Sequence, residues 1–66
     1  MELMINGDRR TVPAVETVAG LLAALDLDPR AVVVELNRTI IRRPTVADTP
    51  VVEGDQVEIV HFVGGG

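Results

Sequence analysis

Side chains that commonly carry out chemistry are scarce in this 66-residue sequence. It contains one histidine, His61, and no cysteine, so it offers no two-histidine metal site, no thiol nucleophile and no redox pair. Serine is also absent, which leaves His61 without a partner for nucleophilic catalysis. The carboxylates are scattered, and no stretch of them resembles a metal-binding loop. We therefore predict no catalytic residue and no metal site, and we interpret His61 as a partly exposed strand residue.

The glycine run at the end of the sequence, Gly64–Gly66, is the strongest remaining candidate for a reactive site. It follows closely on a segment with strand-like alternation, and from Val63 to Gly66 it would reach roughly 13 Å when extended. Because glycine has no Cβ, such a flexible tail could enter a channel that other residues would block. This position favours a carrier whose reactive group is the carboxylate of Gly66. The alternative is a frayed terminus without function, which composition alone favours slightly.

The residues just before the glycines are candidates for docking a partner protein. Phe62 is the only aromatic residue of the chain, and together with Val63 it lies where a docking patch would have to be. Val60 fits a core position and a docking position equally well. Arg42 and Arg43 are further candidates, which would pair with an acidic surface of the partner, although solvated surface charge is the simpler interpretation.

The elements that position these residues begin with a hairpin and a helix. Asn6-Gly7 lies between two short extended runs, which predicts a type I′ hairpin. Thr17 is a plausible N-cap, and the residue before Pro29 is disfavoured in a helix, so we predict a helix of about ten residues that Asp28-Pro29 ends. The apolar residues of this helix recur at helical spacing on one face: Val18, Leu21, Leu22 and Leu25.

Three strands are expected after the helix. Ala31–Asn37 is rich in β-branched residues, Thr39–Ile41 follows the turn candidate Asn37-Arg38, and Gln56–Phe62 alternates. A short helical turn is possible near Val46. The order β-β-α-β-β-β predicts a two-layer α+β domain in which one helix covers one face of a sheet. The last strand is long and apolar, so we expect it beside the first strand at the centre.

Length and composition limit the class of protein. A single domain of this size buries only about 60% of its unfolded surface, so we expect neither an enclosed active site nor an enzyme. The net charge of −4 argues against nucleic acid as the main partner. No apolar segment approaches the roughly 20 residues that span a membrane, and none resembles a signal peptide. We therefore expect no membrane association and a cytoplasmic location.

Three segments together resemble the ThiS family of sulfur carriers, which act in thiazole formation for thiamine biosynthesis. They are Val33–Arg38, the turn Glu53–Asp55 and the run Val57–Gly66. The resemblance covers essentially the whole chain. It implies the ubiquitin-like β-grasp fold, a mixed sheet of four to five strands with one helix packed on one face and a flexible C-terminal tail. Residues 1–63 would form the domain, and residues 64–66 the tail that carries the reactive carboxylate.

The resemblance also implies a mechanism in which the chain is a carrier and not an enzyme. An adenylating enzyme related to ubiquitin-activating enzymes would use ATP and Mg to convert the Gly66 carboxylate to an acyl adenylate. A persulfide sulfur supplied by a cysteine desulfurase would then replace AMP and leave a thiocarboxylate (1-thioglycine), which donates sulfur to thiazole synthase. The chain itself would bind no cofactor. Phe62 and Val63 would dock, while Gly64 and Gly65 would pass through the partner's channel.

Two points stay open at this stage. The family motif is Gly-Gly, and this sequence carries a third glycine; we take Gly66 as the reactive end because the sequence ends there. The alternative functions are a sulfur carrier for molybdopterin or another pathway, a ubiquitin-like protein modifier joined to its targets through Gly66, and an interaction module with an inert tail.

Overall fold

The first hairpin has the predicted turn. In the computed structural model, which describes residues 1–62, β1 (Glu2–Ile5) pairs antiparallel with β2 (Asp8–Thr11). Asn6 and Gly7 connect them with φ of 52° and 85°. Positive φ at both central residues is the requirement of a type I′ turn, whose twist matches that of the flanking strands. The prediction from Asn6-Gly7 is confirmed.

The second hairpin uses the same kind of turn with a less favourable sequence. β3 (Val32–Leu36) pairs antiparallel with β4 (Thr39–Ile41), and Asn37 and Arg38 between them have φ of 50° and 72°. Asparagine adopts this left-handed conformation readily, whereas arginine does so at a cost. Because both residues have positive φ and connect two paired strands, the turn predicted at Asn37-Arg38 is confirmed.

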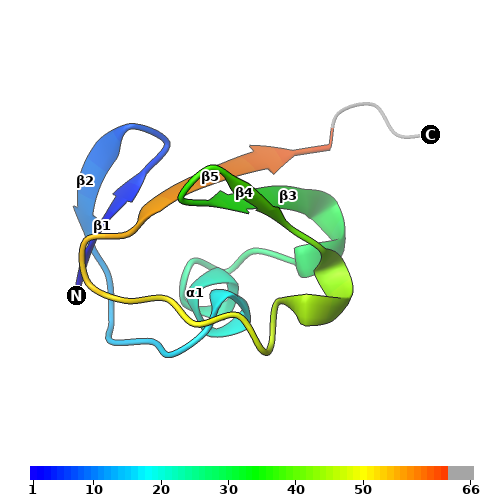
Figure 1. Ribbon diagram of the computed structural model, residues 1–66, viewed down its shortest axis with the longest axis horizontal. Coiled ribbons are helices and arrows are strands. Elements are labelled where there is room, and N and C mark those ends of the chain that lie inside the picture. The colour runs from blue at the N-terminus through cyan, green and yellow to red at the C-terminus, as the bar shows by residue number, and fades with distance from the viewer. Residues whose placement is uncertain (63–66) are drawn as a thin grey trace.

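β5 (Gln56–His61) lies near the centre of the sheet (Figure 1). It pairs parallel with β1 on one side and antiparallel with β3 on the other, which gives the strand order β2-β1-β5-β3-β4. The prediction that the first and last strands are neighbours is confirmed. The described residues form a five-stranded mixed sheet with α1 (Val18–Ala24) packed on one face, which is the architecture that the family resemblance implies (Figure 1).

The helix begins as predicted but ends earlier. The side chain of Thr17 caps the start by accepting a hydrogen bond from the backbone N–H of Gly20 at 3.1 Å. Asp26 adopts a left-handed conformation, with φ of 62°, directly after the C-cap residue Leu25. The helix has seven residues, and the prediction of about ten was wrong.

Two hydrogen bonds close this helix end. The N–H of Asp26 donates to the carbonyl of Ala23 at 3.0 Å, and the N–H of Leu27 donates to that of Leu22 at 2.8 Å. This pair of bonds is the Schellman arrangement, which usually has glycine at the left-handed position. Because an aspartate occupies that position, the sequence gives no clear stop signal there.

Two single turns of 3-10 helix connect the larger elements. Asp28-Pro29, which was expected to end the helix, instead opens the turn η1 (Pro29–Ala31), and the Asp28 side chain caps it. The second turn, η2 (Arg43–Thr45), lies just before Val46, where a short helical turn was considered. None of the helices within residues 1–62 is long and apolar enough to cross a membrane.

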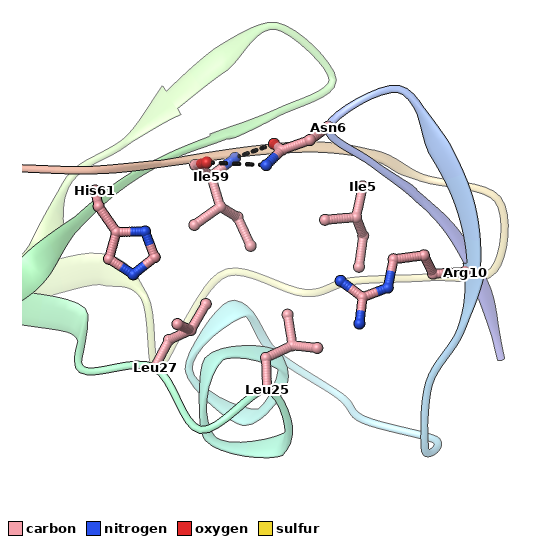
Figure 2. Close-up of a pocket in the computed structure, with 7 residues that line it drawn as sticks. All are labelled: Ile5, Asn6, Arg10, Leu25, Leu27, Ile59 and His61. Carbon is pink, nitrogen blue, oxygen red and sulfur yellow. Dashed lines mark hydrogen bonds between the residues drawn. The ribbon is translucent and has the colours of Figure 1, made fainter.

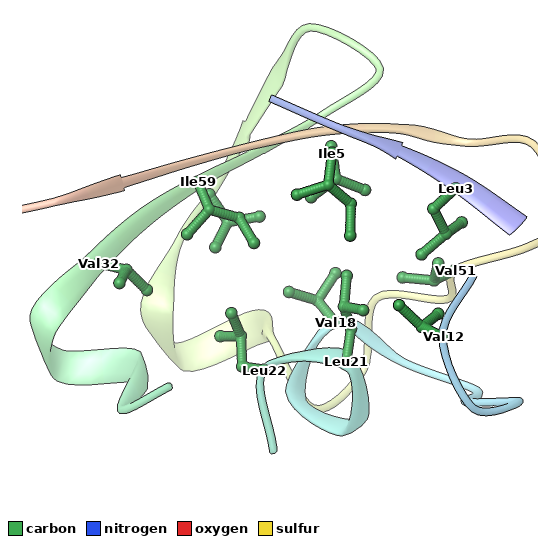
Figure 3. Packing of buried hydrophobic residues seen from close by; sticks show 11 residues of the cluster. Leu3, Ile5, Val12, Val18, Leu21, Leu22, Val32, Val51 and Ile59 are labelled. Atoms are coloured by element: carbon green, nitrogen blue, oxygen red, sulfur yellow. The ribbon is translucent and has the colours of Figure 1, made fainter. Parts of the chain in front are cut away.

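The core lies between α1 and the sheet face toward it (Figure 3). Val18, Leu21 and Leu22 of the helix are completely buried, as the helical spacing predicted, while Leu25 is only half-buried. The remaining core residues come from the strands and from two loop positions: Leu3, Ile5, Val12, Val32, Val34, Val51, Val57 and Ile59. No polar side chain among residues 1–62 is buried, so the core is entirely apolar.

Candidate functional site

The site predicted from the sequence extends from the end of β5 to the last residue of the chain. Val63, Gly64, Gly65 and Gly66 lie outside the described residues, so the docking role of Val63, the channel role of Gly64 and Gly65, and the reactive role of Gly66 stay predictions. The described part of the site consists of β5 up to Phe62 and the surfaces beside it.

Val60 and Phe62 lie on the sheet face opposite the helix. Along β5, Val57 and Ile59 point into the core, and Val60 on the other face is 60% exposed. The backbone N–H of Phe62 donates to the carbonyl of Ala31 at 2.9 Å, which keeps the chain in the sheet to this point. The Phe62 side chain is 59% exposed. The interpretation of Val60 as a core residue is therefore wrong.

A third apolar side chain lies on the same face. Ile40 of β4 is 64% exposed and stands opposite Glu35 of β3, which in turn stands opposite Glu58 of β5. We call Ile40, Val60 and Phe62 the outer-face patch. Exposed apolar side chains that share a face are a common feature of protein-binding surfaces. Exposure is a requirement for the docking role predicted for Val60 and Phe62, and both residues meet it.

The side chain of Asn6 fixes the middle of β5 in place. Its Oδ1 accepts a hydrogen bond from the backbone N–H of Ile59 at 2.7 Å, and its Nδ2 donates to the carbonyl of the same residue at 3.1 Å (Figure 2). The amide thus takes the place of a backbone peptide and extends the pairing of β5 with the first hairpin beyond Ile5. The Asn6-Gly7 pair predicts only the turn role of Asn6, and nothing in its spacing indicates this second role.

The other turn asparagine acts in the same way at the start of β5. The backbone N–H of Asn37 donates to the carbonyl of Gln56 at 2.7 Å, and its Oδ1 accepts from the N–H of Gln56 at 3.0 Å. Its Nδ2 also donates to Asp55 Oδ1 at 3.1 Å. Both hairpin turns therefore position the strand that leads to the glycine run.

Replacement of Asn6 tests this positioning role. Asn6→Ala is expected to lower the free energy of unfolding by about 2–5 kcal/mol, because it removes both hydrogen bonds to Ile59 and puts alanine at positive φ. Asn6→Gly accepts the positive φ without strain and should lose only the hydrogen-bond part. Urea unfolding measures both values. A glycine variant as stable as the original chain would show that the amide does not hold β5.

Arg42 and Arg43 follow β4 in the sequence, Arg42 as the N-cap of η2 and Arg43 as its first residue. Both side chains are exposed, and neither pairs with an acidic residue of the described part of the chain, where the ion pairs are Arg9–Glu2 and Arg30–Asp28. Both arginines are thus accessible to a partner, and their docking role stays a prediction.

Asp28 and Arg30 form an ion pair at η1, whose last residue, Ala31, accepts the backbone hydrogen bond from Phe62. The Arg30 side chain donates to Asp28 Oδ1 at 3.2 Å and to Oδ2 at 3.0 Å, and the backbone N–H of Arg30 adds a third bond at 2.8 Å. The side-chain bonds, followed by the backbone bond, lower the pKa of Asp28. Arg30 is therefore held locally by this carboxylate.

His61 is exposed, as expected from the sequence. It lies on the helix-facing side of β5, at one end of a shallow groove (Figure 2). Within residues 1–62, no group of three or more histidine, aspartate or glutamate side chains comes together as a metal site would require. The described geometry therefore assigns no metal-binding role to His61.

Comparisons with known proteins cover the whole chain. The model of the ThiS family matches residues 3–66. The sulfur carrier protein ThiS of Bacillus subtilis is 38% identical over 65 residues, which is 97% of this chain and 98% of that protein. The crystal structure of the thiamine biosynthesis protein ThiS from Geobacter metallireducens is 40% identical and has a TM-score of 0.83, with both chains covered completely.

A second kind of relative is much longer. A thiazole synthase from Paramagnetospirillum magneticum and one from Magnetococcus marinus are 46% and 39% identical to this chain over 66 residues. The chain spans only 20% of the length of each. In these two proteins, a segment similar to this chain is therefore part of a longer polypeptide.

Proposed function

The chain belongs to the ThiS family, and from this premise we propose that it is a sulfur carrier of thiamine biosynthesis whose sulfur is bound at Gly66. The observation that carries this proposal is the family match through residue 66, which includes the three glycines. The outer-face patch supports it, because Phe62 is exposed and precedes the first of the glycines by two positions in the sequence.

The proposed chemistry begins with activation of the Gly66 carboxylate. A carboxylate is a poor electrophile until one of its oxygens becomes a good leaving group. In the proposed sequence, a carboxylate oxygen attacks the α-phosphorus of ATP on an adenylating enzyme, and pyrophosphate leaves. A persulfide then attacks the acyl carbon and AMP leaves. A thiol then attacks the donor-side sulfur of the resulting acyl disulfide. The S–S bond breaks, a new disulfide forms between the thiol sulfur and the donor sulfur, both from then on oxidised, and the thiocarboxylate remains on Gly66.

The proposed recipient is a thiazole synthase. Two relatives that bear this name contain a segment similar to the chain within one polypeptide, which supports a functional connection between the two. The adenylating enzyme, the ATP and Mg that it uses, and the desulfurase that supplies the persulfide belong to the proposal through the family's chemistry. In this scheme the chain contributes a positioned terminus and a docking surface, and its partners contribute the catalytic groups.

Labelled sulfur tests the proposed function. A carrier loaded with labelled sulfur at Gly66 is expected to transfer the label to the thiazole when it is mixed with thiazole synthase and the remaining substrates. Loading followed by no transfer would contradict thiamine biosynthesis and direct the search to another sulfur-requiring pathway. Formation of isopeptide bonds between Gly66 and lysines of other proteins would instead identify a protein modifier.

The docking role of Phe62 gives a separate prediction. Phe62→Ala is expected to weaken binding to the adenylating enzyme roughly thirtyfold, about 2 kcal/mol, because aromatic anchors contribute heavily to interfaces. Isothermal titration calorimetry measures this change. Val52→Ala is the control, since Val52 is equally exposed, at 59%, but lies in the loop that precedes β5, whereas Phe62 directly follows β5.

Two outcomes would contradict the docking role. Equal weakening by both variants would show that Phe62 has no special contact with the enzyme. Loss of the folded state in Phe62→Ala, seen as a lost unfolding transition, would show that the side chain stabilises the fold.

A further inference from the structure

A groove of about 230 Å³ lies on the helix-facing side of the sheet, at the C-terminal end of α1 (Figure 2). It exists because the helix ends at Ala24 and the chain turns away at Asp26, so the helix does not extend across this part of the sheet. The residues that line the groove come from β1, β2 and β5, from the turn between β1 and β2, and from the segment that follows α1: Ile5, Asn6, Arg10, Leu25, Leu27, Ile59 and His61.

The groove is apolar in the middle, with an arginine at one end and a histidine at the other. Figure 2 shows Leu25 and Leu27 facing the sheet, with the Arg10 guanidinium on one side and the His61 imidazole on the other. Within residues 1–62, neither the Arg10 nor the His61 side chain forms a hydrogen bond or an ion pair with another residue. Asp8 shares the strand face of Arg10 but does not line the groove.

The absence of acidic residues from the lining is notable for this chain. The chain has ten acidic and six basic residues and a net charge of −4, yet none of the seven lining residues is acidic. The Asn6 amide, which also lines the groove, is already engaged by the backbone of Ile59. The groove is therefore complementary to a ligand that is apolar in part and carries a carboxylate.

The edge of β5 beside the groove offers backbone groups as well. Along a strand, successive peptide groups point to opposite neighbours. The backbone C=O of Val57 and the backbone N–H and C=O of Ile59 point toward β1 and Asn6. The backbone N–H of Phe62 points to Ala31 on the other side. The N–H and C=O of His61 therefore point toward the β1 side, where the chain of β1 has already turned away at Asn6. An extended peptide can pair with such an edge.

The size of the groove favours a side chain over a small molecule. Pockets for drug-sized ligands and cofactors usually enclose roughly 300–1,000 Å³. A shallow groove of about 230 Å³ is smaller than that range, and together with the strand edge at His61 it fits a peptide segment that inserts one apolar side chain.

We propose that this groove binds an extended segment of the thiazole synthase, in which an apolar side chain lies next to a carboxylate. The apolar side chain packs on Leu25, Leu27 and Ile59, the backbone pairs with His61, and the carboxylate binds Arg10. The inference rests on the proposed function, because the protein that takes sulfur from Gly66 must approach the chain at the end of β5. The two long relatives named thiazole synthase favour this protein over the adenylating enzyme as the occupant.

The test compares neighbouring arginines on opposite faces of β2. Arg10 lies on the groove side, whereas Arg9 pairs with Glu2 at 3.8 Å and stands opposite Met4. Sulfur-loaded chains carrying Arg10→Glu, Arg10→Lys or Arg9→Glu are titrated into thiazole synthase. We expect Arg10→Glu to weaken binding at least about tenfold, which corresponds to about 1.4 kcal/mol, Arg10→Lys to retain part of the affinity, and Arg9→Glu to bind within about twofold of the original chain.

Several outcomes would overturn the inference. Equal weakening by Arg10→Glu and Arg9→Glu would show a general charge effect. If the Arg10→Glu chain binds thiazole synthase as tightly as the original chain does, thiazole synthase does not occupy the groove. This conclusion holds whether or not the substitution slows adenylation of the chain. Failure of the original chain to accept sulfur at all would refute the proposed function itself, and this is seen in the loading step before any variant is compared.

Discussion

A chain that lacks Gly65 and Gly66 is expected to fold like the original protein and to accept no sulfur. The described fold ends before these residues, so their removal takes away none of the core, the sheet or the helix. Shortening the chain by two residues withdraws the terminal carboxylate by about 7 Å, at 3.3–3.6 Å per extended residue. Adenylation needs in-line positioning of the attacking oxygen, so a displacement of this size should abolish the reaction, and not merely slow it.

Intact mass spectrometry and urea unfolding measure the two parts of this prediction. After incubation with the adenylating enzyme, ATP and a sulfur donor, the shortened chain should retain its original mass, and its unfolding midpoint should be unchanged. Gly66→Ala is the matched variant that keeps the length and changes only the last residue. A shortened chain that still gains sulfur would place the reactive group elsewhere and contradict the proposed site.

Leu22→Ala is expected to have the largest effect on stability. Leu22 is completely buried against the sheet, and truncation of a buried leucine costs about 2–5 kcal/mol. A chain of 66 residues has a net stability of only about 3–10 kcal/mol at 0.05–0.15 kcal/mol per residue. The substitution should therefore remove much of the stability and lower the melting temperature by roughly 10–40 °C, at 4–8 °C per kcal/mol.

Leu25→Ala is the control for this substitution. Leu25 lies on the same stripe of the helix but is only half-buried, so its truncation should cost clearly less. At a temperature where Leu22→Ala is still folded, the Leu22→Ala chain should accept sulfur as the original chain does. Equal destabilisation by the two variants would contradict the packing described for α1.

Much of the fold could be predicted because the local signals agree with the tertiary structure. A type I′ turn requires positive φ at both central residues. Asn6-Gly7 adopts positive φ readily, and it forms the expected turn. The spacing of Val18, Leu21 and Leu22 predicts one apolar helix face, and this face is buried. The long apolar last strand predicts a central position, because an edge strand of that composition would promote aggregation.

The end of the helix could not be predicted, and this error has a consequence for the surface. The Schellman arrangement places Asp26 at a position where glycine is usual, so the sequence carries no stop signal before Pro29. A helix of ten residues would continue to Leu27 and would change the position of Leu25 and Leu27 relative to the sheet. The groove therefore exists because the helix is three residues shorter than the sequence predicts.

The site was only partly predictable from its residues. Strand alternation indicated which face carries Phe62, but it could not decide whether Val60 is covered, since that depends on what packs on the far side of the sheet. The hydrogen bonds between Asn6 and Ile59 join positions that are 53 residues apart in the sequence, and no local pattern indicates such a contact. The role of Gly66 rests on the family resemblance, because a glycine run has no side chain to indicate its chemistry.

The central claim is that Gly66 carries sulfur, and intact mass spectrometry of the original chain tests it most directly. After incubation with the adenylating enzyme, ATP, Mg and a persulfide donor, the mass should increase by the difference between one sulfur and one oxygen. Fragmentation should place the whole increase on Gly66, and omission of ATP should prevent it. An unchanged mass under complete conditions, or an increase located on any other residue, would contradict the claim.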